Sequence, residues 1–130
     1  MNRRTAREKG IQALYQMDLS GAESAEAVAN VLEESDSDSS YLHEIVAGVE
    51  KHREEIDTII KDNLEKWSFD RLAKVDRNIL RLAVYEMNYS DDVPAKVAVN
   101  EAIELAKYFS DERAGKFING VLSKVNQSME

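Results

Sequence analysis

The stretch VDRNILRLAVYEM, residues 75–87, decides the fold of the chain. At about 100° per residue, its apolar side chains cover more than half of a helical wheel, which is broader than the apolar stripe of a helix that packs on one side only. These apolar residues are Val75, Ile79, Leu80, Leu82, Ala83, Val84 and Met87. The pattern therefore predicts a central helix that contacts neighbours on two sides.

The polar residues of this stretch form two groups. Arg77, Asn78 and Arg81 fill the remaining polar strip, whereas Asp76 and Glu86 point into the apolar arc. The ordinary explanations are a first-turn acid favoured by the helix dipole for Asp76 and a satisfied core or capping acceptor for Glu86. The alternative is that both acids mark the edge of a docking surface. Periodicity alone favours the ordinary explanations.

Elsewhere the sequence shows helical spacing and no strand pattern. No alternating run of β-branched residues occurs, and the Asn-Gly pair at 119–120 stands in a helical context. We therefore expect an all-α protein with about seven helices. They are predicted at about 6–19, 25–34, two within 41–67, 75–87, 97–109 and 112–126.

Three local features refine this prediction. Thr5 and Glu8 have the spacing of a capping box, which predicts the start of the first helix. The apolar pattern of 41–67, which ends at Trp67, loses its phase around residues 52–55, so we expect a break there. Gly115 and Gly120 lie inside the last helix, where each costs about 1 kcal/mol relative to alanine. They therefore indicate a close backbone approach to another helix or to a ligand.

The charge is unevenly distributed along the chain. The formal net charge is −8, yet residues 1–9 carry four bases and one acid, a local sum of +3. Residues 20–65 carry 13 acids and 3 bases, and residues 66–130 are neutral in sum. This asymmetry permits RNA binding at the N-terminal end, while the rest of the surface repels nonspecific polyanions.

The sequence lacks the patterns of catalytic and cofactor sites. It contains no cysteine, and no ligand motif surrounds its two histidines, His43 and His52. It also has no glycine-rich phosphate loop and no nucleophile motif. We therefore expect a binding protein, not an enzyme, with no cofactor and no metal site. Because there is neither a membrane-spanning apolar run nor a secretory signal, we expect a cytoplasmic location.

Three segments carry more specific information than composition does. They are RRTAREKGIQALYQMDLS at 3–20, VDRNILRLAVYEM at 75–87 and VPAKVAVNEAIELAKYFSDERAGKFINGVL at 93–122. In this order, and over essentially the whole chain, they resemble the NusB family of bacterial transcription antitermination factors. The phrases NEAIELAK and KFINGVL are the specific part of the resemblance.

The resemblance implies both a fold and a function. The fold would consist of two packed helical subdomains, at about 1–52 and 53–130. The function would be binding of the boxA element of nascent ribosomal RNA transcripts, jointly with the small-subunit ribosomal protein also called NusE. This assembly would join the other Nus factors in the transcription elongation complex and support rRNA transcription by RNA polymerase.

The resemblance also implies site residues by position. RNA-binding positions fall on Arg3, Arg4, Arg7, Gln12, Tyr15, Lys116 and Phe117, and partner-protein positions fall on Asp76, Tyr85 and Glu86. Aromatic rings that stack on unpaired bases, an amide and arginines suit single-stranded RNA. Without the resemblance, core packing is the better explanation for both aromatic rings. Two positions depart from some relatives: Thr5 replaces an arginine, and Arg113 replaces an acid.

Two other functions stay open. The first is a protein-binding helical adaptor without intrinsic RNA affinity, which would use Asp76 and Glu86. The second is the NusB-like domain that is fused to ribosomal RNA methyltransferases. We disfavour the second because the sequence ends at Glu130 without a glycine-rich methyl-donor motif.

Overall fold

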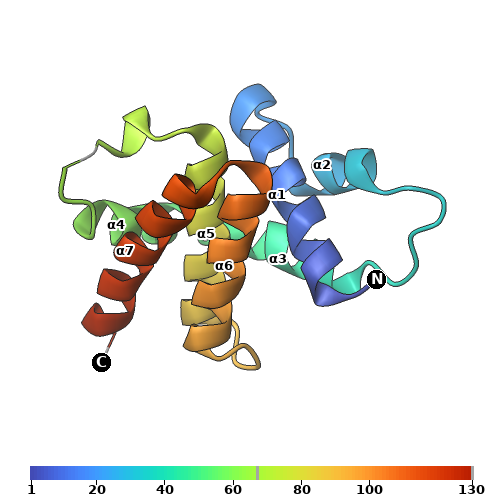
Figure 1. Cartoon of the computed structure of the whole chain (residues 1–130). Coiled ribbons are helices and arrows are strands. Elements are labelled where there is room, and N and C mark those ends of the chain that lie inside the picture. The colour runs from blue at the N-terminus through green and yellow to red at the C-terminus, as the bar shows by residue number, and fades with distance from the viewer. Residues whose placement is uncertain (67, 130) are drawn as a thin grey trace.

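Seven α-helices and one short 3-10 helix build the fold over the described residues (Figure 1). This computed structural model describes residues 1–66 and 68–129, and no strand occurs within them. The helices are α1 (Arg3–Ser20), α2 (Ser24–Val31), α3 (Ser40–Lys51), α4 (Arg53–Asp62), η1 (Phe69–Arg71), α5 (Lys74–Tyr89), α6 (Ala95–Phe109) and α7 (Glu112–Ser128). The predicted all-α class is confirmed. None of the described helices is long and apolar enough to cross a membrane.

Helix α5 is the centre of the arrangement. It contacts α1 and α3 as well as α4, α6 and α7, and Figure 1 shows α1–α3 to one side of it and α4 and α7 to the other. Every residue from Arg77 to Met87 is buried. The predicted central helix with neighbours on two sides is therefore confirmed. The division into two subdomains at residues 52 and 53 stays a prediction, since α5 contacts both groups of helices.

The structure contradicts the predicted start of the first helix and agrees with its predicted end. Helix α1 begins at Arg3, and the Asn2 side chain caps it by accepting a hydrogen bond from the Thr5 backbone N–H at 2.8 Å. The predicted capping box of Thr5 and Glu8 is therefore wrong, because asparagine is a stronger cap than threonine and stands three residues earlier. The predicted end is confirmed: Gly21 follows Ser20 with a φ of 74°.

The predicted break within 41–67 falls at His52, between α3 and α4. The His52 backbone N–H still bonds to the Gly48 carbonyl at 3.1 Å, and its ring stacks on Tyr89 with centroids 4.0 Å apart. The chain thus changes direction here without losing its packing against α5. Trp67, the predicted end of the second apolar stripe, lies outside the described residues.

The polar strip of α5 is buried in a cluster of ion pairs. Arg77 donates to Asp18 at 2.7 and 3.1 Å, Asn78 donates to the same oxygen at 3.1 Å, and Arg81 donates to Asp57 at 2.8 and 3.0 Å. Burial alone would raise the pKa of Asp18, but the bond from Arg77 and the nearby Arg81 lower it overall. This cluster fixes the C-terminal half of α1 and helix α4 to α5.

We expect Asp18→Asn to destabilise the protein by about 3 kcal/mol at pH 7, because it leaves buried arginine charge uncompensated. The pKa of Asp18 is lowered in the folded state, so its contribution is present above its ordinary pKa of 3.8 and is lost as pH falls through the folded value. Urea unfolding at pH 7 and at pH 3 should therefore show a smaller difference from wild type at pH 3. Asp62→Asn, on an exposed side chain, is the matched control.

The glycines of the helices have different surroundings. A Cβ on Gly115 would lie 3.3 Å from the Lys107 side chain of α6, so the predicted close approach to another helix is confirmed there. At Gly120 no other helix approaches, since no described residue beyond its chain neighbours and its own helical backbone comes within 4 Å of such a Cβ. The alternative of a ligand at Gly120 stays a prediction. Gly48, by contrast, leaves room for the Tyr85 ring, which a Cβ would overlap.

Two alanine variants should therefore change stability in opposite directions. Gly120→Ala should raise the free energy of unfolding by up to about 1 kcal/mol, because it adds helix propensity in open space. Gly48→Ala should lower it by about 1–3 kcal/mol, because the buried Tyr85 ring must move. Denaturant melts of both variants test this, and equal shifts of the same sign would contradict the packing described.

Candidate functional site

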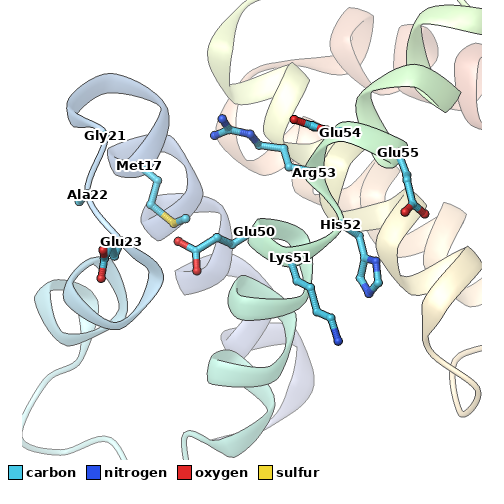
Figure 2. Close-up of a pocket in the computed structure, with 10 residues that line it drawn as sticks. All are labelled: Met17, Gly21, Ala22, Glu23, Glu50, Lys51, His52, Arg53, Glu54 and Glu55. Carbon is cyan, nitrogen blue, oxygen red and sulfur yellow. The ribbon is translucent and has the colours of Figure 1, made fainter.

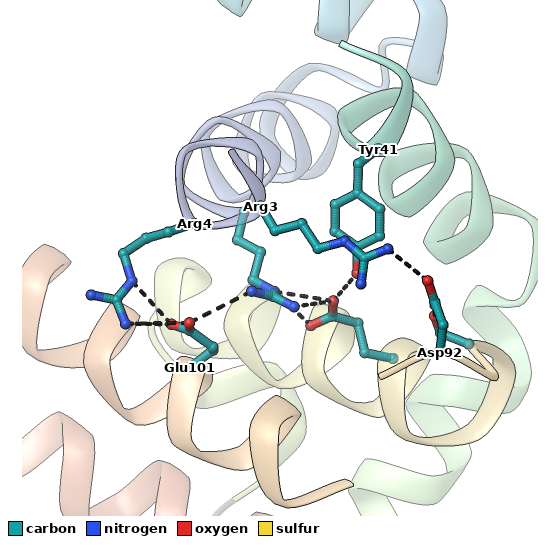
Figure 3. A network of polar contacts seen from close by, with 8 residues as sticks. Arg3, Arg4, Tyr41, Asp92 and Glu101 are labelled. Atoms are coloured by element: carbon teal, nitrogen blue, oxygen red, sulfur yellow. Dashed lines mark hydrogen bonds and ion pairs between the residues drawn. The ribbon is translucent and has the colours of Figure 1, made fainter. Parts of the chain in front are cut away.

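The first turn of α1 presents two exposed arginines, each paired with a carboxylate (Figure 3). Arg3 donates to Asp92 at 2.6 Å, and Asp92 lies in the turn between α5 and α6. Arg4 binds both oxygens of Glu101 on α6 at 3.1–3.3 Å. Their side chains remain 47% and 62% exposed, respectively, so both guanidinium groups can be reached from solvent.

Arg7 lies one turn further and is buried. Its guanidinium donates to both oxygens of Glu86 at 3.0 Å, and the Tyr41 hydroxyl donates to the same carboxylate. Burial alone would lower the pKa of Arg7, but the bond to Glu86 raises it overall. Burial, followed by donation to Glu86, raises the pKa of Tyr41. Arg7 and Glu86 therefore join α1, α3 and α5 in the interior.

The next two turns of α1 expose the amide and the ring predicted for RNA. Gln12 is exposed, and Tyr15 on the same face is 36% exposed. Core packing, the better explanation of Tyr15 from the residues alone, is not what the structure shows. Leu19, also exposed, continues this face toward the end of α1.

Lys116 and Phe117 lie near the start of α7 and share a hollow with Asp76 of α5. All three line a hollow of about 540 Å³ between the start of α5 and α7. Lys116 is exposed, and Phe117 is partly buried. The same two residues also line a smaller hollow of about 220 Å³ with Lys66 and Lys124. Phe117 thus lines two hollows, each of which also has several cationic side chains in its lining.

The Asp76 carboxylate faces the larger hollow from the first turn of α5. Burial raises its pKa, and the charge of Asp111 across the hollow raises it further. Within residues 1–66 and 68–129, no hydrogen bond or ion pair holds this carboxylate. The arginines that line this hollow are Arg71 and Arg113. The position at which Arg113 replaces the acid of some relatives is therefore part of this hollow.

The structure does not bring Tyr85 and Glu86 to this surface. Tyr85 packs against Gly48 in the core, and Glu86, 1% exposed, is held by Arg7 and Tyr41. Of the two acids in the apolar arc, Glu86 is a satisfied core acceptor, and Asp76 is the one that lines a cavity. A direct partner contact by Tyr85 or Glu86 stays a prediction.

One exposed aromatic residue was missed by the sequence analysis. Tyr108 on α6 is 69% exposed and lines a small hollow with Arg4 and Glu8 of α1. The sequence places Tyr108 directly before Phe109, which is partly buried against the core, and gives no signal that Tyr108 faces solvent. The exposure of Tyr108 makes the surface of α1 and α6 richer in aromatic groups than the sequence predicted.

A further hollow, of about 490 Å³, lies where α1 ends and α3 meets α4 (Figure 2). Four glutamates line it, namely Glu23, Glu50, Glu54 and Glu55, against Lys51 and Arg53. Its excess of negative charge disfavours a polyanion. No group of three or more metal-ligating side chains gathers in the described part of the chain.

Comparison with known proteins identifies the family. The family model described as NusB matches residues 4–127, nearly the whole chain. The chain belongs to the NusB family. It is 51% identical over 130 residues to the transcription antitermination protein NusB of Bacillus velezensis, covering 100% of this chain and 99% of the relative. The NusB of Geobacillus kaustophilus shows the same identity and coverage.

Solved NusB structures share the fold. A T. maritima NusB superposes with a TM-score of 0.90 at 35% identity, covering 98% of this chain and 92% of that one. A complex of the antitermination factors NusB and NusE with double-stranded RNA superposes with a TM-score of 0.88 at 37% identity, covering 97% and 96%. The curated relatives are named as transcription antitermination proteins, which agrees with the expectation that the chain is not an enzyme.

We expect Phe117→Ala to weaken RNA binding by about 1–3 kcal/mol, as for loss of a base-stacking ring. Because Phe117 is only partly buried, its loss should destabilise the fold by less than the roughly 3–5 kcal/mol of a fully buried phenylalanine. Phe69→Ala is the control: Phe69 is buried, so this variant should lose more stability, yet its folded fraction should bind RNA normally. Equal RNA affinity in Phe117→Ala and wild type would exclude stacking on this ring.

Proposed function

We propose that this protein is a transcription antitermination factor that binds the boxA element of nascent ribosomal RNA together with the ribosomal protein NusE. It would act without catalysis, in the cytoplasm, and support rRNA transcription with the other Nus factors. The observation that carries the proposal is the 37% identity over 97% of this chain to the NusB of a NusB–NusE–RNA complex.

The RNA surface is proposed to run along α1, α6 and the start of α7. Exposed arginines at the first turn of α1 can bind phosphates, and Gln12 and Tyr15 can meet bases on the same helix. Helix α6 leads from Glu101, beside Arg4, to Ser110 and Asp111, where α7 begins with Lys116 and Phe117 in its first turns. Arg7 supports this surface from the interior. Its bond to Glu86 fixes α1, the helix that carries the exposed arginines, Gln12 and Tyr15.

The partner surface is proposed to be the hollow at Asp76. A half-buried carboxylate with no partner in the described chain favours a cationic group supplied from outside. Ribosomal proteins are usually basic, and charge complementarity of this kind steers association. The apolar part of the lining, Leu72, Ala73 and Ala114, would bury the stem of a lysine or arginine side chain.

A filter-binding titration tests the RNA part of the proposal. The protein is titrated against a boxA-like RNA and a scrambled RNA of equal length, at two salt concentrations, with and without NusE. We expect preference for the boxA-like RNA that increases with NusE, and an affinity that falls with salt. Equal affinity for both RNAs in the presence of NusE would contradict the proposal.

The alternative is a protein-binding adaptor without intrinsic RNA affinity. One observation favours it: Arg3, Arg4 and Arg7 are all engaged by carboxylates within the protein. The titration without NusE separates the two functions, because the adaptor would bind RNA only when the ribosomal protein supplies the contacts.

Asp76 should show opposite effects on stability and on partner binding. The folded pKa is raised, so the stability linked to this carboxyl is present below its ordinary pKa of 3.8 and is lost as pH rises through the folded value. Asp76→Asn should therefore stabilise the protein at pH 7 while weakening NusE binding. Asp76→Lys should weaken NusE binding by several kcal/mol, since it brings like charges together.

Melting curves and NusE titrations of both variants measure these effects. Binding of RNA alone should not weaken, because neither variant removes a proposed RNA contact, although Lys116 and Phe117 line the same hollow. Asp62→Lys, at an exposed site outside the hollow, controls for the change in net charge. A loss of stability in Asp76→Asn, with normal NusE affinity, would mean that Asp76 serves the fold instead of the interface.

A further inference from the structure

The exposed arginines of α1 are not free in this protein. Carboxylates and RNA phosphates offer a guanidinium group the same kind of acceptor, two oxygens that receive parallel hydrogen bonds. Glu101 already uses this geometry on Arg4, and Asp92 binds Arg3. A phosphate that reaches either arginine must therefore share it with a carboxylate or displace the carboxylate.

We propose that Asp92 and Glu101 compete with RNA phosphates for Arg3 and Arg4, and thereby limit the RNA affinity of this surface. This inference rests on the proposed RNA-binding function. It assigns to two acids of the chain a role opposite to that of the arginines they contact.

Both acids are held in place to act in this way. The Ser90 hydroxyl donates to Asp92 at 3.1 Å, and Arg3 also lies over the Tyr41 ring at 4.3 Å. Hydrogen bonds from Arg3 and then from Ser90 lower the pKa of Asp92, so it stays ionised at neutral pH. Glu101 is more enclosed, because it packs between Arg4 and the buried Arg7, whose nearest nitrogen is 3.7 Å away.

The exchange needs no unfolding. The side chains of Arg3 and Arg4 are 47% and 62% exposed, so they can turn from carboxylate to phosphate while Arg7, 4% exposed, keeps α1 fixed. Phosphate contacts carry no sequence information, so the competition weakens binding to any RNA. Base contacts elsewhere on the surface then decide which RNA still binds tightly.

The experiment is a double-mutant cycle on the full chain. Affinities for a boxA-like and a scrambled 12-nucleotide single-stranded RNA are measured at low salt for Asp92→Asn, Glu101→Gln, Arg3→Gln, Arg4→Gln and the paired combinations. Asp91→Asn and Glu104→Gln remove one neighbouring negative charge each without touching these pairs. Circular dichroism confirms that each variant is folded.

We expect Asp92→Asn and Glu101→Gln each to raise the affinity for both RNAs, by about two- to fivefold, in the range of exposed ion pairs. The two control variants should give clearly smaller increases. The gain from Asp92→Asn should vanish in the Arg3→Gln background, and the gain from Glu101→Gln in the Arg4→Gln background.

Three results would overturn the competition: gains no larger than those of the controls, gains that persist without the arginine, or a loss of affinity. A loss would mean that the carboxylates position the guanidinium groups for RNA. The scrambled RNA keeps this outcome distinct from failure of the proposed function. If the protein does not prefer the boxA-like RNA, the proposed function fails, but the mutant cycle still tests competition for phosphates. If the protein does prefer it, a negative cycle overturns only the competition.

Discussion

The buried ion pair of Arg7 and Glu86 is the interaction on which the rest of this structure depends. It joins the first turns of α1 to the last turns of α5, Tyr41 brings α3 to the same carboxylate, and Glu101 of α6 approaches from the other side. Removing one member of such a pair leaves an uncompensated buried charge. A second cluster around Asp18 fixes the other end of α1 to the same central helix.

Clamping α1 at both ends has a functional consequence. Arg3, Arg4, Gln12 and Tyr15 are presented on a helix that cannot turn about its axis, so their relative positions are set before any ligand arrives. Preorganisation of this kind reduces the entropy lost on binding. The same clamps explain why α5 has no solvent-facing strip, since its arginines and its glutamate are used to hold α1 and α4.

The sequence predicted the helices and their order because apolar spacing is a local property. Residues 75–87 showed a helix with two packed sides, and the phase loss near His52 located the break. The pairing of Arg77 and Arg81 with Asp18 and Asp57 was not predictable, because those partners are distant in sequence and a buried arginine has the same local pattern as an exposed one. The resemblance marked Arg7 and Glu86 as functional positions, but only the structure showed that they contact each other, and that Asp76 alone of the two acids lines a cavity.

Amide chemical-shift mapping of the labelled protein tests the central claim most directly, namely that RNA and partner use two different surfaces of a rigid scaffold. A boxA-like RNA should perturb the first turns of α1 and Tyr15, and NusE should perturb the surroundings of Asp76 and Asp111. Lys116 and Phe117 line the same hollow as Asp76 and should respond to both ligands. The amide chemical shifts of the residues around the acidic hollow at His52 should not change in either titration. Perturbations confined to that acidic hollow, or the same set of residues perturbed by both ligands, would contradict the account.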